Sequence, residues 1–291
     1  MSEAIESSGQ PLIRILHPSD FSKASRVAFA HALKLALHAK AELEIVHVAS
    51  PSHKPGAADD VHWADFPGVR TTLARWEILP LGAKPEEVAK TGLRVKKILN
   101  SASDPLAAMV RYCAAHPPDL VVLATHQHEG LARWLYKPVA EPLARSSRAM
   151  TLFVPAHGKG FIAPADGAVT LKRILIPVDH RPDAQQAVEE AYFLAAELGC
   201  RTVEITLLHV GSKPPLPTLY LPHHPGWTWH TRRVPGDAVE EILKRDQEWS
   251  PDLIVMATQG HRDFLDALRG STTERVLRGA RCPVLAVPAK S

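Results

Sequence analysis

The chain contains an internal repeat, and this feature constrains its fold more than any other. Pro118–Thr125 reads PDLVVLAT and Pro251–Thr258 reads PDLIVMAT, so the two runs match at six of their eight positions, at an offset of 133 in the numbering. Each run leads to a short apolar segment that ends in Val-Pro, at Val154 and at Val287, which is the same offset. A tandem duplication accounts for both coincidences.

The beginnings of the two copies also match, at a different offset. Arg14–Asp20 reads RILHPSD and Arg173–Asp179 reads RILIPVD, which is an offset of 159. His47 and His209, each followed by Val, close the next apolar run at an offset of 162. The offset falls from 162 to 133, so the first copy has 29 additional residues before its PDL run.

Both copies show the same order of predicted elements. Short apolar runs without polar alternation are typical of strands buried on both faces, and helical patterns separate most of them. In each copy an irregular stretch follows the second apolar run and leads to a strand of more polar character. Such an order indicates parallel β-α-β units. We therefore predict two tandem, doubly wound, open parallel five-stranded sheets with helices on both faces, a Rossmann-like α/β fold. The predicted strands begin near residues 13, 43, 93, 118 and 149 in the first copy, and near 174, 203, 229, 251 and 283 in the second.

Local signals place several helix ends. Asp104 before Pro105, and Asp237 with Glu240, are typical helix starts, and Gly199 is a typical helix end. We expect an N-terminal domain at 1–155, a Gly-, Ala- and Pro-rich linker at 156–170 and a C-terminal domain at 171–291. The additional residues fall in 50–92, with a helix near 68–76, and the Pro-rich segment 211–226 is expected to be an irregular loop.

Composition excludes several classes of function. There are 34 basic and 31 acidic residues without a long basic block, and 6% aromatic residues, so no nucleic-acid partner is expected. No uncharged apolar window is long enough to span a membrane, and the N-terminus lacks a secretory pattern, so a cytoplasmic location is expected. Cys113, Cys200 and Cys282 are far apart and are interpreted as buried apolar residues rather than a redox or metal site.

The loop after the second PDL run contains the residues that suggest binding chemistry. Gly260 allows a tight backbone approach to a phosphate. Gly270 and Ser271 open a helix whose free N–H groups favour an anion, and the hydroxyl of Thr272 adds a donor. The alternative is structural, since Ser271 with Glu274 also forms a helix-capping box.

At this point the motifs resemble the universal stress protein family, and the whole chain is similar to its tandem members. The second copy has RILIPVD, LLHV, DLIVMATQG-x9-GSTTERVL and CPVLAVP, and the first has RILHPSDFS, EIVHV, DLVVLATH and TLFVP. The matching order extends over nearly the entire chain apart from the linker and the irregular regions.

This resemblance implies an adenine nucleotide ligand, ATP, which Mg²⁺ could accompany. The family pattern G-x-x-G-x9-G-[ST] matches Gly260, Gly270 and Ser271, while Ala257 replaces its first glycine. The resemblance assigns the other contacts to the strand ends and to the start of the last helix, namely Pro177, Asp179, Val210, Met256 and Thr272. Asp179 suits ribose hydroxyls, although a turn-forming role at the strand end is the alternative.

The first copy departs from the phosphate-binding pattern. Aligned on the PDL strand, Gln127 replaces Gly260, and Lys137 with Pro138 replaces Gly270-Ser271, so side chains occupy positions that need bare backbone. A nucleoside half-pocket is retained in the sequence at Pro18, Asp20 and Val48, and Lys137 could meet a phosphate as a point charge. We interpret this copy as having a degenerate, closed site.

Two functional hypotheses follow from the resemblance. The first is a stress-response protein that binds ATP in its C-terminal half. We expect it to be regulatory, because the sequence offers no evident general base for efficient hydrolysis of ATP. The second is a nucleotide-free scaffold that acts through unidentified protein partners. The family dimerises through its last strand, so we expect 149–154 and 283–287 to pair antiparallel as an intrachain pseudo-dimer, with a homodimer as a further option.

Overall fold

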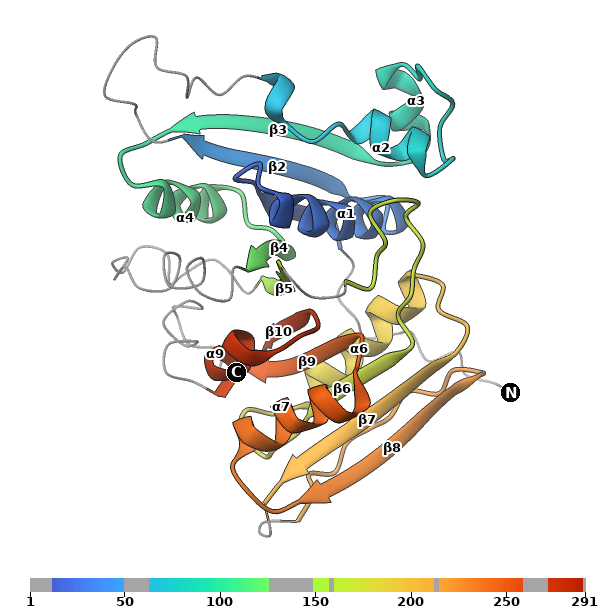
Figure 1. Cartoon of the computed structure of the whole chain (residues 1–291), viewed down its shortest axis with the longest axis vertical. Helices are drawn as coiled ribbons and strands as arrows, with labels where there is room; N and C mark the ends of the chain where they lie inside the picture. The colour runs from blue at the N-terminus through green and yellow to red at the C-terminus, as the bar shows by residue number, and fades with distance from the viewer. Residues whose placement is uncertain are drawn as a thin grey trace.

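The computed structural model describes residues 12–49, 63–125, 149–156, 160–211, 215–258 and 272–289. Strands and helices follow one another along both halves of the chain (Figure 1), although the described residues between 210 and 227 contain no helix. In chain order the elements are β1 (Arg14–Pro18), α1 (Lys23–His38), β2 (Glu42–Ala49), a 3-10 turn (Trp63–Asp65), α2 (Val69–Arg75), α3 (Pro85–Lys90), β3 (Arg94–Ser101), α4 (Pro105–Ala115), β4 (Leu120–Thr125), β5 (Met150–Pro155), β6 (Arg173–Pro177), α6 (Gln185–Glu197), β7 (Val203–Val210), β8 (Trp227–Val234), α7 (Ala238–Trp249), β9 (Leu253–Thr258), α9 (Thr272–Gly279) and β10 (Val284–Pro288).

The strands of the described ranges form one sheet with the order β3-β2-β1-β4-β5-β10-β9-β6-β7-β8. Each half therefore has the same five-strand order, and all its neighbours are parallel. The two halves join where β5 and β10 pair antiparallel, with Leu152 opposite Leu285. The doubly wound α/β fold is confirmed, and so is the expected antiparallel contact between the last strands; the two five-stranded sheets are continuous.

The repeated PDL motif has a structural role at the start of the first strand in each half. Asp119 Oδ2 accepts hydrogen bonds of 2.8 Å from the N–H groups of Ile13 and Arg14. Asp252 Oδ2 does the same at 2.8 and 2.9 Å for Lys172 and Arg173. These carboxylates accept hydrogen bonds from N–H groups at the strand ends that have no partner in the sheet. This structural role accounts for the Asp in both copies and requires no ligand.

The two repeated histidines also have the same structural role. His209 Nδ1 donates to Val178 O at 3.1 Å, and His47 Nδ1 donates to Ser19 O at 2.6 Å. Each bond ties the end of the second strand to the turn after the first. The expectation that these histidines are structural is therefore supported by their bonding.

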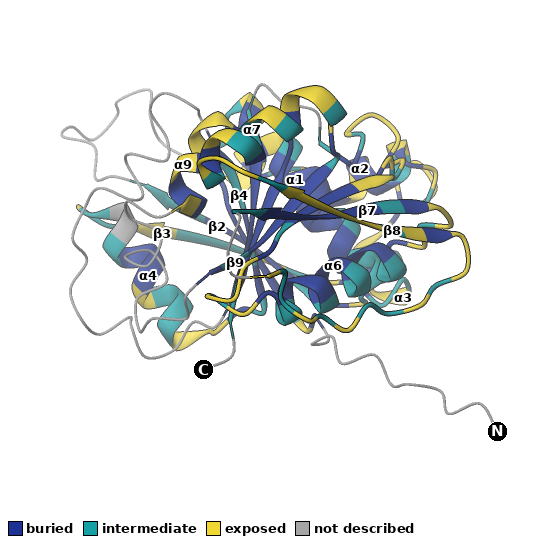
Figure 2. Cartoon of the chain, turned by 90° about the horizontal axis from the view of Figure 1, so that it is seen from below, coloured by how far each residue is buried: buried dark blue, intermediate teal, exposed yellow. Residues whose placement is uncertain are grey.

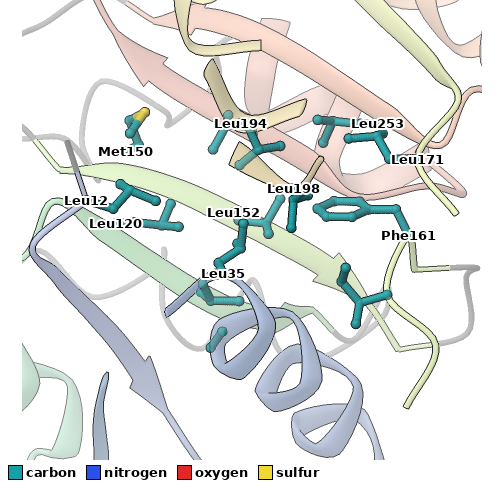
Figure 3. Close-up of a cluster of buried hydrophobic side chains, with 14 of the residues drawn as sticks. Leu12, Leu35, Leu120, Met150, Leu152, Phe161, Leu171, Leu194, Leu198 and Leu253 are labelled. Atoms are coloured by element: carbon teal, nitrogen blue, oxygen red, sulfur yellow. The ribbon is translucent and has the colours of Figure 1, made fainter. Parts of the chain in front are cut away.

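The helices cover both faces of the sheet, and one face has a core common to both halves. Helices α1 and α6 lie on that face, and α4, α7 and α9 lie on the opposite face, where there are two separate apolar clusters, one beneath α4 and one beneath α7 and α9 that also includes Phe153 of β5. Figure 2 shows the buried strands running between the helices. At the junction the shared core holds Leu35 of α1, Leu152 of β5 and Leu198 of α6 (Figure 3). The halves are thus joined by packing as well as by strand pairing.

The segment expected to be a linker is packed onto the first half. Phe161 and Ile162 are 0% and 1% exposed, and Ile162 forms an isolated bridge with Val169. Trp76, which follows α2 in the additional residues of the first copy, donates from Nε1 to Pro164 O at 3.2 Å. The insertion in the first copy therefore helps to hold the connection between the halves.

The predicted helix ends are also present. Asp104 accepts from Ala107 N, and Asp237 accepts from Val239 N and Glu240 N. Gly199 follows α6 with φ of 68°, a left-handed conformation that glycine adopts without strain. None of the helices in the described ranges has the length and apolar character needed to cross a membrane.

Candidate nucleotide-binding site

A pocket of about 430 Å³ lies at the carboxyl ends of the central strands in the second half. This volume is within the ~300–1,000 Å³ range of small-molecule sites. It lies where ligands bind in doubly wound sheets, at the crevice beside the first strand. Its walls come from β6 and the turn after it, from the ends of β7 and β9, and from the first turns of α7 and α9.

Six of the nine residues predicted for the site line this one pocket, although they come from separate parts of the chain. They are Pro177, Asp179, Val210, Met256, Ala257 and Thr272. The other three, Gly260, Gly270 and Ser271, are outside the described residues, so their predicted phosphate contact stays a prediction.

Asp179 is exposed at the end of β6 and lines the pocket. Its Oδ1 accepts a 2.7 Å hydrogen bond from His180 N, which is the turn-forming role named above as the alternative. A carboxylate has acceptor sites for further bonds. The turn role and a ligand role are therefore compatible at this position.

Ala257, which replaces the first glycine of the family pattern, lies within β9 opposite Val287. It is absent from the non-glycine residues with positive φ, so an alanine is unstrained here. Its methyl group and the side chain of Met256 contribute apolar surface to the pocket wall. The substitution thus costs the backbone nothing at this position.

The lining of the pocket includes the first residues of a helix. α9 begins at Thr272, and both Thr272 and Thr273 line the pocket. The unpaired N–H groups of a helix start and its dipole attract anions. Close by, Asp237 at the start of α7 forms an ion pair with Arg275 of α9 at 3.6 Å, which connects the two helices that flank the pocket.

Several wall residues were not predicted from the sequence. Arg181 is an exposed cation two positions after Asp179, and Ala238 and Ile242 present the inner side of α7. Arg181 could have been found as a charge in the turn after the first strand. Ala238 and Ile242 are four residues apart and follow the predicted helix start at Asp237, so their shared face could also have been expected.

The corresponding positions of the first half have different surroundings. Pro18 is buried, whereas Pro177 is partly exposed. Asp20 is exposed, and its Oδ1 accepts from Ser22 N at 3.0 Å, next to the start of α1. Val48 packs against the cluster beneath α4. Gln127, Lys137 and Pro138 are outside the described residues, so the predicted closure of this site stays a prediction.

The histidine-rich loops provide no metal centre in the described residues. Within those ranges, no group of three or more His, Cys, Asp and Glu side chains is arranged to hold a metal ion. His224 stacks on Trp227 at 4.3 Å between ring centroids, and His230 lies 3.4 Å from Glu204. These rings are engaged with neighbouring side chains.

The profile of the universal stress protein family matches the chain at residues 13–155 and again at 219–288. This chain belongs to the universal stress protein family. Because two regions match and the strand order repeats, it is a tandem member. The second match begins after β7, so the likeness of β6 and β7 to the first half is seen in the sheet order and in the RILIPVD motif.

Individual universal stress proteins are similar to this chain. One from Methanocaldococcus jannaschii is 28% identical over 149 residues, covering 42% of this chain and 85% of that protein. The crystal structure of another, from Archaeoglobus fulgidus, superposes with a TM-score of 0.56 at 18% identity, covering 94% of this chain and 98% of that one, and shows the same fold. A further universal stress protein, solved in complex with cAMP, covers 50% of this chain and 99% of its own, with a TM-score of 0.31 and 18% identity.

Proposed function

We propose that this tandem universal stress protein is a cytoplasmic stress-response factor that binds ATP in its second half. The proposal is supported above all by one observation, the convergence of six predicted contact residues on a single pocket at the carboxyl ends of β6, β7 and β9. The strand ends meet because β9, β6 and β7 are neighbours in the sheet, and the pocket between them and the start of α9 is formed by the residues that the family resemblance assigns to nucleotide contacts.

Each part of the pocket suits one part of a nucleotide. Met256, Ala257 and Val210 provide apolar surface for a base, and Asp179 can accept hydrogen bonds from ribose hydroxyls. The start of α9 attracts phosphate groups, and Arg181 adds a cation to the same wall. Gly260, Gly270 and Ser271 are proposed to complete the phosphate contact, and Mg²⁺ would neutralise part of the phosphate charge.

The nucleotide is proposed to act as a regulatory ligand rather than as a rapidly hydrolysed substrate. Binding would alter the surface that the protein presents to partners, with slow or absent release of phosphate. The domain limits proposed for this arrangement are 1–155 and 171–291, joined by 156–170. The intrachain arrangement through β5 and β10 is proposed to act as the equivalent of a family dimer.

Calorimetry with ATP tests the proposal, and the repeat supplies a matched control. Asp179→Ala should weaken ATP binding about tenfold, because a hydrogen bond to a charged group is lost. Asp20→Ala makes the same change at the corresponding position of the first half and should leave the affinity unchanged. Gly270→Glu should abolish binding by filling the phosphate space with a like charge. Absence of binding at millimolar ATP, or equal losses in both Asp variants, would overturn the proposal.

The scaffold hypothesis predicts a different result for protein purified from cells. A nucleotide-free scaffold should show no adenine absorbance and no nucleotide mass after denaturation, and its surface should bind partners equally well with or without ATP. Ultraviolet absorbance and mass spectrometry of the released small molecules distinguish the two functions.

A further inference from the structure

A second hollow, of about 450 Å³, lies beneath the C-terminal half of α7 and has no wall residue in common with the candidate nucleotide pocket. We call it the α7 hollow. Its polar wall comes from β7, β8 and α7 and includes Glu204, Thr206, His230, Arg232, Arg245 and Trp249. Unlike the nucleotide pocket, it is on the face of the sheet rather than at the strand ends.

The corresponding place in the first half is filled by a closed network of charged side chains. Tyr112 of α4 donates to Glu44 Oε2 at 3.0 Å. Lys96 Nζ lies 2.8 Å from Glu42 and 3.8 Å from Glu44, and Arg14 Nε lies 3.6 Å from both carboxylates. Arg94 Nε also lies 3.9 Å from Glu42, so both carboxylates of this half are paired with cations of the same chain.

Strand register establishes which residues correspond. Lys96 is the partner of Glu44 in the β2–β3 ladder, and His230 is the partner of Thr206 in the β7–β8 ladder. Thr206 therefore stands in the place of Glu44, and His230 in the place of Lys96. On the covering helix, the same offset that relates the two PDL runs places Arg245 at the position of Tyr112.

These replacements reverse the charge at the same place in the fold. In the first half, these positions carry two carboxylates, Glu42 and Glu44, and cations of the same chain pair with both of them. In the second half, the hollow is lined by one carboxylate, Glu204, which lies 3.4 Å from His230, and by the guanidinium groups of Arg232 and Arg245. The hollow thus lacks the second carboxylate that the first half supplies from its own chain.

The two guanidinium groups have few partners. Arg245 is 18% exposed, and its ion pair with Glu248 on the same helix is long, at 4.0 Å. Arg232 has neither an ion pair nor a hydrogen bond with any side chain in the described part of the chain. Guanidinium groups present paired donors that match phosphate oxygens, and the hydroxyl of Thr206 adds another donor.

We propose that the α7 hollow is a binding site for a small phosphate-bearing anion, held by Arg232 and Arg245. The ligand would supply the negative charge that Glu44 supplies in the first half. Trp249 gives the hollow one flat aromatic wall against which a planar group attached to the phosphate can lie. This inference does not depend on ATP binding at the other pocket.

Titration of the full chain with inorganic pyrophosphate, followed by calorimetry, tests this site. Arg245→Gln should weaken binding about tenfold or more, because a charge-assisted contact is lost. Lys244→Gln is the matched control, since it removes the same charge from the adjacent residue of α7, whose side chain is 60% exposed. That control should change the affinity less than about twofold, because an exposed charge is screened.

Two further variants make the result decisive. The double variant Thr206→Glu with Arg245→Tyr transplants the first-half residues and should abolish pyrophosphate binding while circular dichroism shows a folded protein. Gly270→Glu, which alters the proposed nucleotide loop, should retain pyrophosphate binding. The proposal is overturned if wild-type protein binds no pyrophosphate at millimolar concentration, if Arg245→Gln and Lys244→Gln behave alike, or if Gly270→Glu alone removes binding.

Discussion

Lowering the pH from 7 to 5 should destabilise the fold through His31, a fully buried residue of α1. Its Nδ1 donates to Val27 O at 2.8 Å, and its Nε2 accepts from Ile162 N at 3.2 Å. The ring is therefore held in its neutral form, because a proton on Nε2 would face the N–H group of Ile162. Burial lowers the pKa of His31 from 6.5 to about 4.

The direction and size of the effect follow from this shift. Between pH 6.5 and 4 the unfolded chain binds a proton at His31 that the folded chain does not, so stability is complete above pH 6.5 and is lost as the pH falls. A shift from 6.5 to about 4 corresponds to a loss of about 2 kcal/mol between pH 7 and pH 5. His17 is also fully buried, with its pKa lowered to about 4 by burial, and adds a similar loss.

Urea unfolding at pH 7, 6 and 5, followed by tryptophan fluorescence, measures the effect. His31→Gln keeps an amide donor and an acceptor without a titrating group, and should lose about 2 kcal/mol less than wild type between pH 7 and 5. His223→Gln makes the same change at an exposed histidine and should follow wild type. Other titrating groups, such as Glu44, whose pKa is raised by burial, are present in all three proteins and cancel in the comparison.

Identical pH dependence in wild type and His31→Gln would refute the reasoning. It would mean that protonation of His31 is not coupled to unfolding. Hydrogen exchange gives a second, local readout: the amide of Ile162 should lose protection in wild type as the pH falls, relative to the exchange rate expected at each pH, and the buried amides of β7 should not.

The remaining predictions concern packing and thiol chemistry. Leu152→Ala should destabilise the protein by ~2–5 kcal/mol in urea unfolding, because it leaves a cavity in the core common to both halves, and a single cooperative transition should move. Gly160→Ala should lower the melting temperature, because an added Cβ would lie 2.2 Å from His31 Cε1 in a packed interior. Iodoacetamide should alkylate Cys113 and Cys200 slowly at pH 8 in the folded protein and rapidly in urea, because burial raises their pKa to about 12 and about 11; fast alkylation of the folded protein, counted by mass spectrometry, would contradict this.

Much of the fold could be predicted because the same motifs and the same order of elements occur twice in the sequence. Buried parallel strands appear as apolar runs, and the two PDL motifs align the halves. The predicted pairing of the last strands followed from family resemblance and was confirmed in the sheet. The site was predictable to the extent that strand ends meet at one edge, which brought Asp179, Val210 and Met256 together.

Other features depend on contacts between distant segments and carry no local signal. Leu35 and Leu198 are ordinary apolar positions on two helices, and nothing in either helix predicts that both contribute to one core across the junction. The segment containing Phe161 has the composition of a linker, yet its docking depends on His31 and on Trp76 from the insertion. The charge reversal at Arg245 becomes visible only when the strand register is known.

The antiparallel joint between β5 and β10 lies within one polypeptide, and this has a consequence for how the two copies can diverge. A dimer of identical chains must carry the same residue at both equivalent positions, and its assembly depends on protein concentration. Covalent linkage makes the pairing unimolecular, so it persists at any dilution. It also frees each copy to change alone, as Glu44 and Thr206 show. A single gene product can thereby hold two different binding surfaces in a fixed one-to-one ratio.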